Sequence, residues 1–410
     1  MQKRVFRVGL LILPVLLALS CWVQPAAAFT AEQKLVSQAW RIVDRAYLDN
    51  TFNHQNWAAV RQKLLKQPLP DTEAAYSAIG EMMASLDDPF TRLLKPEQYR
   101  SLKVNTSGEL TGVGLQIVLN SEGQLEVVAP ITGSPAEKAG IRPRDRIVQI
   151  DGVSTAEFTI DQAAARMRGA KGSNVILTVE RNGEAIGEIA LVRDRIALNP
   201  VVAELRSSPE KVIGYIRLTQ FNANATAQIA TAIAQLEQQG ADGYILDLRN
   251  NPGGLLQAGI EIARLWLDTG TIVYTVNRQG VQGSFEAIGQ ALTHDPLVVL
   301  VNQGTASASE ILAGALQDNQ RAQLVGQTTF GKGLIQSLFD LSDDAGLVVT
   351  VAKYETPNHR DIHKLGITPD YLVPLEPITR DRVGTTADSQ YEAAVKLLTT
   401  DSVVAGVAAK

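Results

Sequence analysis

Residues 297–310 have the sequence LVVLVNQGTASASE, in which five aliphatic residues are followed by a turn of small and polar residues. An aliphatic run of this length is typical of a strand that is buried on both faces of a sheet. The next segment, 308–316, has the pattern of a helix. Strand, turn and helix in this order form half of the unit from which parallel sheets are built. We therefore expect Ser307 at the amino end of a helix.

The same alternation continues on the amino-terminal side of this stretch. Strands are predicted over 212–218 and 243–248, and helices over 224–239 and 255–267. Buried strands that alternate with helices predict a parallel-rich sheet covered by helices. This part of the chain is therefore expected to be an α/β core.

Two other patterns precede the core. Between 30 and 99, apolar residues recur at helical spacing, whereas between 101 and 195 short strands are separated by glycine-rich turns. After residue 377 the sequence is alanine-rich and helical in pattern. We expect a multidomain chain of α/β and α+β class, with these parts: a signal peptide at 1–28, a helical N-terminal region at 29–100, a β-rich module at 101–195, an α/β core at 196–377 and a C-terminal helical segment at 378–410.

Residues 1–28 have the features of a secretory signal peptide: a basic start, an apolar stretch over 8–19 and small residues at 26–28. The apolar stretch is shorter than the roughly 20 residues that a membrane-spanning helix needs. The alternative is an uncleaved anchor. Cleavage would also remove Cys21, the one cysteine, and a cysteine-free product suits an oxidising compartment. We expect an exported protein that is soluble once the signal is cleaved and that acts outside the cytoplasm.

Composition excludes several classes of protein. The chain has 410 residues, 45% hydrophobic and 20% charged, which argues against disorder and against a multi-span membrane protein. The net charge of −5 gives no indication of nucleic-acid binding. One cysteine and four histidines offer no disulfide framework and no cysteine-ligated metal site. His359 and His363 are interpreted as turn residues rather than metal ligands, so we expect no metal and no cofactor.

Ser307 is the first candidate for chemistry. At a helix amino terminus, free N–H groups and the helix dipole favour an oxygen that gains negative charge. The alternative interpretation is structural, because Ser307 and Glu310 have the spacing of a capping box. A serine hydroxyl also needs a base that removes its proton.

Lys332 is the candidate base, in the sequence TFGKGLIQ at 329–336. Flanking glycines allow close passage of another segment, and Phe330 is expected to exclude water, so that the neutral amine is favoured. A lysine in an apolar loop can instead extend to solvent. Residues 326–332, GQTTFGK, also match the first seven positions of a phosphate-binding loop. However, Gly333 stands where that motif needs Ser or Thr, and 334–339 alternates like a strand.

A second glycine turn, DLRNNPGG at 247–254, again follows a predicted buried strand. Its backbone N–H groups could donate to an oxyanion. The alternative is an ordinary strand-to-helix turn, which proline and glycine favour.

Taken together, GTASASEILAGALQD at 304–318 and FGKGLIQ at 330–336 resemble the carboxyl-terminal processing proteases, tail-specific peptidases that use a Ser–Lys pair. The 25-residue separation of the two candidates agrees with that family. The resemblance implies that Ser307 is the nucleophile, Lys332 the general base and Gln336 the residue that orients the lysine. It further implies an oxyanion hole made by two backbone N–H groups, those of Ala308 and of Gly253 or its neighbour Gly254.

The same resemblance implies that the β-rich module is a PDZ domain. Its carboxylate-binding loop would be TGVGL at 111–115, where Gly112, Val113, Gly114 and Leu115 would bind a peptide that adds as a strand to a sheet edge. The partner is then the C-terminal tail of a protein.

Two further stretches, VAKYETP at 351–357 and KLGITPD at 364–370, are most similar to the photosynthetic branch of the family. That similarity implies a serine endopeptidase that removes the C-terminal extension of the photosystem II D1 precursor. A broad-specificity periplasmic tail-specific protease and a non-catalytic PDZ scaffold remain as alternatives.

Overall fold

The computed structural model describes residues 29–208, 210–374, 378–379 and 382–399. The predicted signal peptide at 1–28 lies outside the described residues. Within the described part of the chain, no helix has the length and apolarity needed to cross a membrane. The chain forms two compact units, Met1–Pro96 with Ser337–Val349, and Glu97–Gln336 with Thr350–Lys410.

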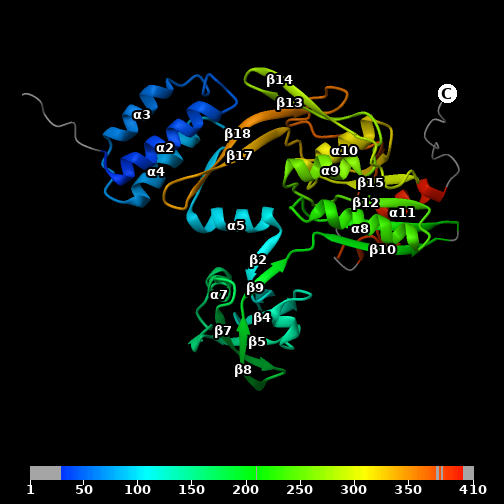
Figure 1. The fold of residues 1–410 in the computed structure, drawn as a ribbon, viewed down its shortest axis with the longest axis horizontal. Helices are drawn as coiled ribbons and strands as arrows, with labels where there is room; N and C mark the ends of the chain where they lie inside the picture. Colours follow the sequence, from blue (N-terminus) through cyan, green and yellow to red (C-terminus); the bar gives the residue numbers. More distant parts are fainter. Residues whose placement is uncertain (1–28, 209, 375–377, 380–381, 400–410) are drawn as a thin grey trace, which may run out of the picture. The chain divides into compact units, whose positions relative to one another are not determined.

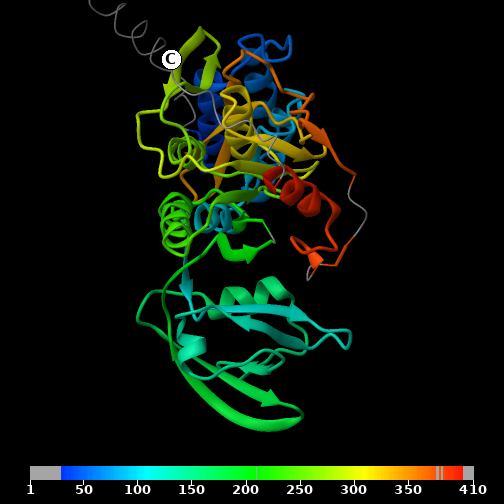
Figure 2. The ribbon, with the colours of Figure 1, turned by 90° about the vertical axis from the view of Figure 1, so that its right-hand side faces the viewer.

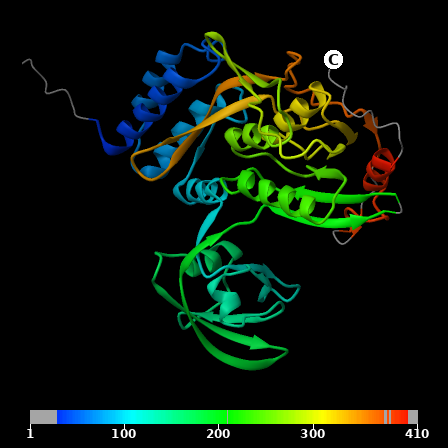
Figure 3. The same ribbon diagram turned by 45° about the vertical axis from the view of Figure 1, so that its right-hand side comes forward.

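The first unit is mainly helical, as the sequence pattern predicted. Its elements are α2 (Ala31–Ala46), α3 (Trp57–Lys66), α4 (Thr72–Ala84) and β1 (Arg92–Leu94). Helix α2 contacts both α3 and α4, and the three helices are drawn in blue in Figure 3. Strand β1 pairs antiparallel with the start of β18 (Gly346–Glu355), where Leu94 lies opposite Gly346. Residues 337–349 therefore fold with the helical region.

The second unit begins with α5 (Pro96–Ser107) and the β-rich module. The module has five larger strands, β3 (Leu115–Leu119), β4 (Leu125–Pro130), β5 (Arg146–Ile150), β7 (Asn174–Arg181) and β8 (Glu184–Val192). Its short elements are β2 (Glu109–Gly112), α6 (Pro135–Lys138), β6 (Val153–Ser154), α7 (Ile160–Met167) and β9 (Asp194–Ala197). The sheet order is β3-β4-β5-β7-β8, so β3 lies at one edge, and Figure 2 shows β7 and β8 as a long hairpin.

The core is a sheet of six strands in the order β10-β11-β12-β15-β16-β19. The neighbours from β11 to β19 are parallel, and β10 is antiparallel to β11, which confirms the predicted parallel-rich sheet. The strands are β10 (Val201–Ser207), β11 (Val212–Leu218), β12 (Gly243–Asp247), β15 (Leu297–Val301), β16 (Gln323–Gly326) and β19 (Tyr371–Leu372).

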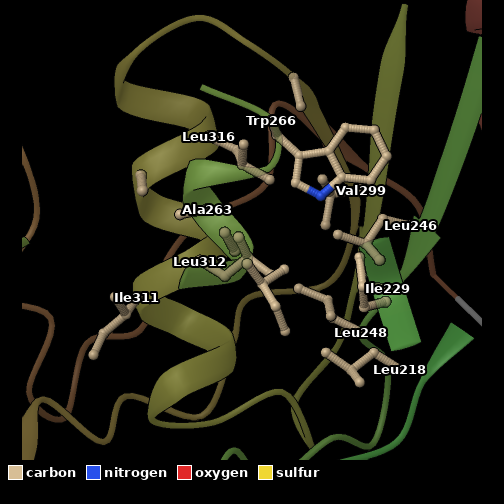
Figure 4. Close-up of a cluster of buried hydrophobic side chains, with 14 of the residues drawn as sticks. Leu218, Ile229, Leu246, Leu248, Ala263, Trp266, Val299, Ile311, Leu312 and Leu316 are labelled. Carbon is tan, nitrogen blue, oxygen red and sulfur yellow. The ribbon is translucent and has the colours of Figure 1, made fainter. Parts of the chain in front are cut away.

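Helices cover both faces of this sheet because its central strands are apolar on both sides. Leu246 and Val299 face the cluster that contains α8 (Ala225–Gln238), α9 (Leu256–Arg264) and α10 (Ala308–Asp318). Ile245 and Val298 face the opposite cluster, which contains α11 (Ser389–Thr399), drawn in red in Figure 1. Figure 4 shows Leu312 and Leu316 of α10 in the first cluster. This packing fixes α10, and with it the preceding turn.

A second set of strands borders the core. Strands β13 (Thr271–Asn277) and β14 (Gly280–Glu286) form an antiparallel hairpin, and β13 also pairs with the end of β18. Strand β17 (Leu334–Asp340) follows the Lys332 loop and pairs with β18. The alternating segment at 334–339 is thus a strand, whereas a phosphate-binding loop needs a helix at this point.

Candidate active site

Three neighbouring parallel strands, β12, β15 and β16, end at the same edge of the core sheet. The segments that follow them carry Gly253, Ser307 and Lys332, respectively. Backbone hydrogen bonds join these segments: Ala306 N–H donates to the Asn251 carbonyl, and Phe330 N–H donates to the Thr305 carbonyl, each at 3.0 Å. The fold therefore brings the three predicted segments together.

Ser307 occupies a strained backbone conformation between β15 and α10. Its φ is +57° and its ψ is −118°, a combination that residues with a side chain seldom adopt. The capping box of the alternative interpretation is also present, with Ser307 N–H donating to the Glu310 carboxylate at 2.8 Å. A serine on a sharp turn between a strand and a helix, with its hydroxyl projecting from the turn, is typical of a catalytic nucleophile. Strain of this kind is held at functional sites by the surrounding structure.

Glu310 connects the two predicted catalytic residues through their backbones. This side chain has an exposed fraction of 0%. One carboxylate oxygen accepts hydrogen bonds from the N–H groups of Ser307 at 2.8 Å and Lys332 at 2.9 Å. The other accepts from the Thr329 hydroxyl at 2.5 Å and from Gly331 N–H at 2.7 Å. The capping-box spacing was the sequence signal for Glu310, but it did not predict the bonds to the lysine loop.

Tyr354, on β18, is a second connection that the sequence analysis did not identify. Its hydroxyl donates to the Ser307 carbonyl at 3.1 Å, and its N–H donates to the Gly333 carbonyl at 3.0 Å. Burial, and then the nearby Glu310 carboxylate, raise the pKa of Tyr354 well above its ordinary value. The hydroxyl therefore stays protonated and remains a donor. Tyr354 lies in the stretch VAKYETP, which carried the family resemblance but gave no role to this residue.

The glycine turn after β12 lies directly against the nucleophile turn. A Cβ atom on Gly253, whose φ is +92°, would lie 2.6 Å from the Ala306 oxygen and 2.9 Å from the Ala308 nitrogen. Gly254 instead approaches Phe221, whose oxygen would be 2.1 Å from an added Cβ. Of the two glycines, Gly253 therefore lies beside Ala308.

The two predicted oxyanion donors differ in their hydrogen bonds. Gly253 N–H donates to the Asn251 side-chain oxygen at 2.9 Å. Ala308 N–H, at the first position of α10, donates no hydrogen bond within the described part of the chain. The Ala308 N–H is therefore the donor that is available in this arrangement.

The Lys332 loop is built on close backbone approaches. A Cβ on Gly331 would lie 3.0 Å from the Leu365 nitrogen, and one on Gly333 would lie 2.9 Å from the His363 nitrogen. The flanking glycines thus allow the segment with His363 and Leu365 to pass close to the Lys332 loop, as the sequence predicted. The expectation for Phe330 is wrong: its side chain is 57% exposed, because the ring points to solvent instead of covering the loop.

Gln336 lies on β17, four residues after Lys332. Its side-chain nitrogen is buried and has no hydrogen-bond partner among the described residues. The predicted role of Gln336, to orient the lysine, stays a prediction.

A buried ionic cluster supports the glycine turn. Arg249 pairs with Asp247 at 2.6 Å and with Asp388 at 2.7 Å, and Tyr215 donates its hydroxyl to Asp247 at 2.7 Å. Burial raises the pKa of Asp388, but the hydrogen bonds from Arg249, Gly384 and Tyr391 and the charge of Arg249 together outweigh it, so the net shift is downward. The cluster connects the start of the glycine turn to the segment before α11.

The predicted peptide-binding loop joins β2 to β3 in the β-rich module. The carbonyls of Val113 and Gly114 accept hydrogen bonds from the N–H groups of Ala136 and Ile131, at 3.0 Å and 2.9 Å. Neither Val113 N–H nor Gly114 N–H donates a hydrogen bond within the described residues. Gly112 ends β2, and Leu115 begins β3, the edge strand. This arrangement suits a carboxylate at the loop and a peptide strand along the edge.

His359 lies beside an aromatic ring and a carboxylate. His359 stacks on Tyr274 with ring centroids 4.1 Å apart and pairs with Glu355 at 3.2 Å. Over the described ranges, no group of three or more His, Cys, Asp or Glu side chains could hold a metal ion.

Comparisons with known proteins give the families of the core and of the β-rich module. Residues 212–373 match peptidase family S41, and residues 126–181 match the PDZ domain. The chain is 63% identical over 384 residues to a carboxyl-terminal-processing protease of Picosynechococcus sp., covering 93% of each chain. It is 47% identical over 363 residues to carboxyl-terminal-processing peptidase 2, chloroplastic, of Arabidopsis thaliana, covering 85% of this chain and 70% of that one.

A solved structure, the photosystem II D1 C-terminal processing protease, is also similar. Its sequence identity to this chain is 39% and the TM-score is 0.57. The match covers 92% of this chain and all of that chain. The similarity therefore extends over the helical region, the module and the core.

Proposed function

Because the chain belongs to the carboxyl-terminal-processing proteases of peptidase family S41, we propose that it is an exported serine endopeptidase that removes C-terminal extensions from proteins. The observation that carries this proposal is the strained Ser307 turn, which Glu310 connects to the Lys332 loop. The proposed catalytic pair is Ser307 and Lys332, with Gln336 as the residue that orients the lysine.

In the proposed reaction, neutral Lys332 takes the proton of the Ser307 hydroxyl as the hydroxyl oxygen attacks a peptide carbonyl carbon. The carbonyl oxygen becomes an oxyanion, which the Ala308 N–H stabilises. Gly253 supplies a second donor once its N–H exchanges the Asn251 oxygen for the oxyanion. The carbon–nitrogen bond then breaks, and the leaving amine takes the proton from Lys332. Water, deprotonated by Lys332, hydrolyses the acyl-enzyme and frees Ser307.

Substrate selection is assigned to the PDZ domain. A free C-terminal carboxylate would bind at the loop formed by Gly112, Val113, Gly114 and Leu115, and the peptide would extend along β3. The N–H groups of Val113 and Gly114, which donate no bond within the described residues, support this assignment. Recognition by the main chain and the carboxylate would select for a chain end.

The proposed substrate is the precursor of the photosystem II D1 protein, in the thylakoid lumen. This part of the proposal is supported by the similarity to a protease whose name includes that substrate, and by chloroplastic and cyanobacterial relatives. Thylakoid lumen and periplasm both require export, for which residues 1–28 provide a predicted signal.

The test is a digest of three peptides by the purified protein. The first carries the D1 C-terminal extension with a free carboxylate, the second is the same peptide with an amidated end, and the third is an unrelated unfolded tail. We expect cleavage of the first peptide and much slower cleavage of the other two, with no cleavage by Ser307→Ala. Equal cleavage of all free tails would instead identify a broad tail-specific protease. Binding without cleavage would identify a scaffold.

A further inference from the structure

Three donors hold the oxygen of the peptide group that joins Ser307 to Ala308. The N–H groups of Glu310 and Ile311, at 2.8 Å and 3.0 Å, belong to the first turn of α10. The third donor, the Tyr354 hydroxyl at 3.1 Å, comes from a different element, β18. The Ser307 carbonyl is therefore fixed both from within its own helix and from a neighbouring strand.

The other end of the same peptide group is the Ala308 N–H. A trans peptide group is planar, so its C=O and N–H bonds point in opposite directions and cannot turn independently. A donor that fixes the oxygen therefore also fixes the direction of the N–H. Hydrogen bonding to the oxygen also polarises the group, which strengthens the N–H as a donor.

We propose that Tyr354 is a positioning residue, whose hydroxyl orients the Ser307–Ala308 peptide group so that the Ala308 N–H faces the oxyanion. The inference rests on the proposed function, because it assumes that Ala308 N–H stabilises a tetrahedral intermediate. It adds a residue that acts on the reaction through another group and does not touch the substrate.

Tyr354 is itself held rigidly. Its side chain has an exposed fraction of 0%, and in the pairing of β18 with β13 it lies opposite Thr275. Its own N–H donates to the Gly333 carbonyl, next to Lys332. One buried residue thus contacts both the peptide group of the nucleophile and the segment that carries the base.

The strain at Ser307 explains why this peptide group needs an external donor. A backbone conformation of this type is unfavourable and persists only where its surroundings enforce it. Relaxation of the φ and ψ angles of Ser307 would rotate the following peptide group, and with it the Ala308 N–H. The Tyr354 hydroxyl opposes that rotation.

The change Tyr354→Phe removes the hydroxyl and keeps the ring. The Ser307 carbonyl would retain the N–H groups of Glu310 and Ile311, so no buried acceptor is left without a donor. Loss of a complete oxyanion donor lowers kcat by about 10²–10³ in known enzymes. For a misdirected donor we expect a smaller fall in kcat, by about tenfold to a hundredfold, with KM within twofold of wild type, because the oxyanion forms only after substrate binds.

Tyr244→Phe is the matched control. Tyr244 is also fully buried in the core, on β12, and its hydroxyl donates to Glu237 at 2.8 Å. Each variant therefore loses one hydroxyl hydrogen bond from a buried tyrosine. For both, kcat, KM and the thermal midpoint would be measured, together with the affinity for a peptidyl boronic acid, which forms a tetrahedral adduct with the serine.

The inference predicts that Tyr354→Phe lowers kcat and boronate affinity by similar factors, while Tyr244→Phe changes neither by more than twofold. Three results would overturn it: a kcat for Tyr354→Phe within twofold of wild type, an effect on KM alone, or equal losses in both variants. Boronate affinity needs no peptide cleavage, so it tests Tyr354 separately. The wild type could bind the boronate more tightly than Tyr354→Phe does and yet cut no tail. That result would contradict the proposed function and support this inference.

Discussion

The carboxylate of Glu310 is where the structure most clearly predicts the effect of a small change. The substitution Glu310→Gln keeps the size of the side chain and replaces one oxygen by an NH₂ group. If the NH₂ group replaces Oε2, it faces the N–H groups of Ser307 and Lys332. If it replaces Oε1, it faces Gly331 N–H and the Thr329 hydroxyl. In the first orientation two N–H donors face the NH₂ group; in the second only Gly331 N–H does, because the Thr329 hydroxyl can turn and accept.

At least one hydrogen bond to a charged group is lost in each case. At about 1.5–3 kcal/mol for each such bond, the free energy of unfolding should fall by at least that amount. The effect on catalysis should be large as well, because a displacement of about 1 Å between reacting groups can cost about a hundredfold in rate. We therefore expect kcat for Glu310→Gln to fall at least a hundredfold.

Urea unfolding and steady-state kinetics measure the two effects separately. The unfolding midpoint should shift at constant m-value, which indicates a change in stability and not in the compactness of either state. Glu237→Gln is the control, since Glu237 accepts one hydroxyl hydrogen bond, from Tyr244, and a glutamine can still accept it. The proposed connection between the two loops would be refuted if Glu310→Gln had a free energy of unfolding within about 1 kcal/mol of wild type and a kcat within threefold of wild type.

Three further predictions follow from the site. Asp388→Asn leaves Arg249 with one fewer buried partner, so the free energy of unfolding measured in urea should fall by about 3–5 kcal/mol. Folding lowers the pKa of Asp388, so its contribution to the free energy of unfolding is complete above about pH 4, the ordinary range of this carboxyl. That contribution is lost as the pH falls through the lowered pKa. In a pH series, Asp388→Asn should therefore lose less stability in acid than the wild type does. Gly253→Ala places a Cβ 2.6 Å from the Ala306 oxygen, so kcat should fall at least about tenfold while calorimetry shows unchanged binding of a free C-terminal peptide. Finally, kcat/KM should rise toward alkaline pH, because only neutral Lys332 accepts a proton, and a flat profile from pH 6 to 9 would argue against a lysine base.

The core was predictable because its signals are local in the sequence. The aliphatic strands at 243–248 and 297–301 and the helix that begins at Ala308 follow from runs of a few residues, and the structure has them at nearly the same bounds. Parallel neighbours end at one edge of a sheet, so Ser307 and Gly253 could be expected near one another.

The residues that were missed depend on contacts between distant parts of the chain. Tyr354 contacts a residue 47 positions away, and Arg249 pairs with a residue 139 positions away. Strand β13 has mixed burial, whereas β18 is buried over its first five residues and then alternates to Glu355, a strand pattern that the sequence analysis left unassigned. Phe330 was expected to exclude water from Lys332, but the adjacent glycine leaves the direction of its side chain undetermined.

The central claim is that Ser307 is acylated with Lys332 as the base. The direct measurement is mass spectrometry of the enzyme quenched in acid during turnover of a tail peptide. We expect an acyl adduct on the proteolytic fragment that contains Ser307, formed by the wild type and absent from folded Lys332→Ala. An adduct on another residue, or one that forms on Ser307 at the wild-type rate without Lys332, would contradict it.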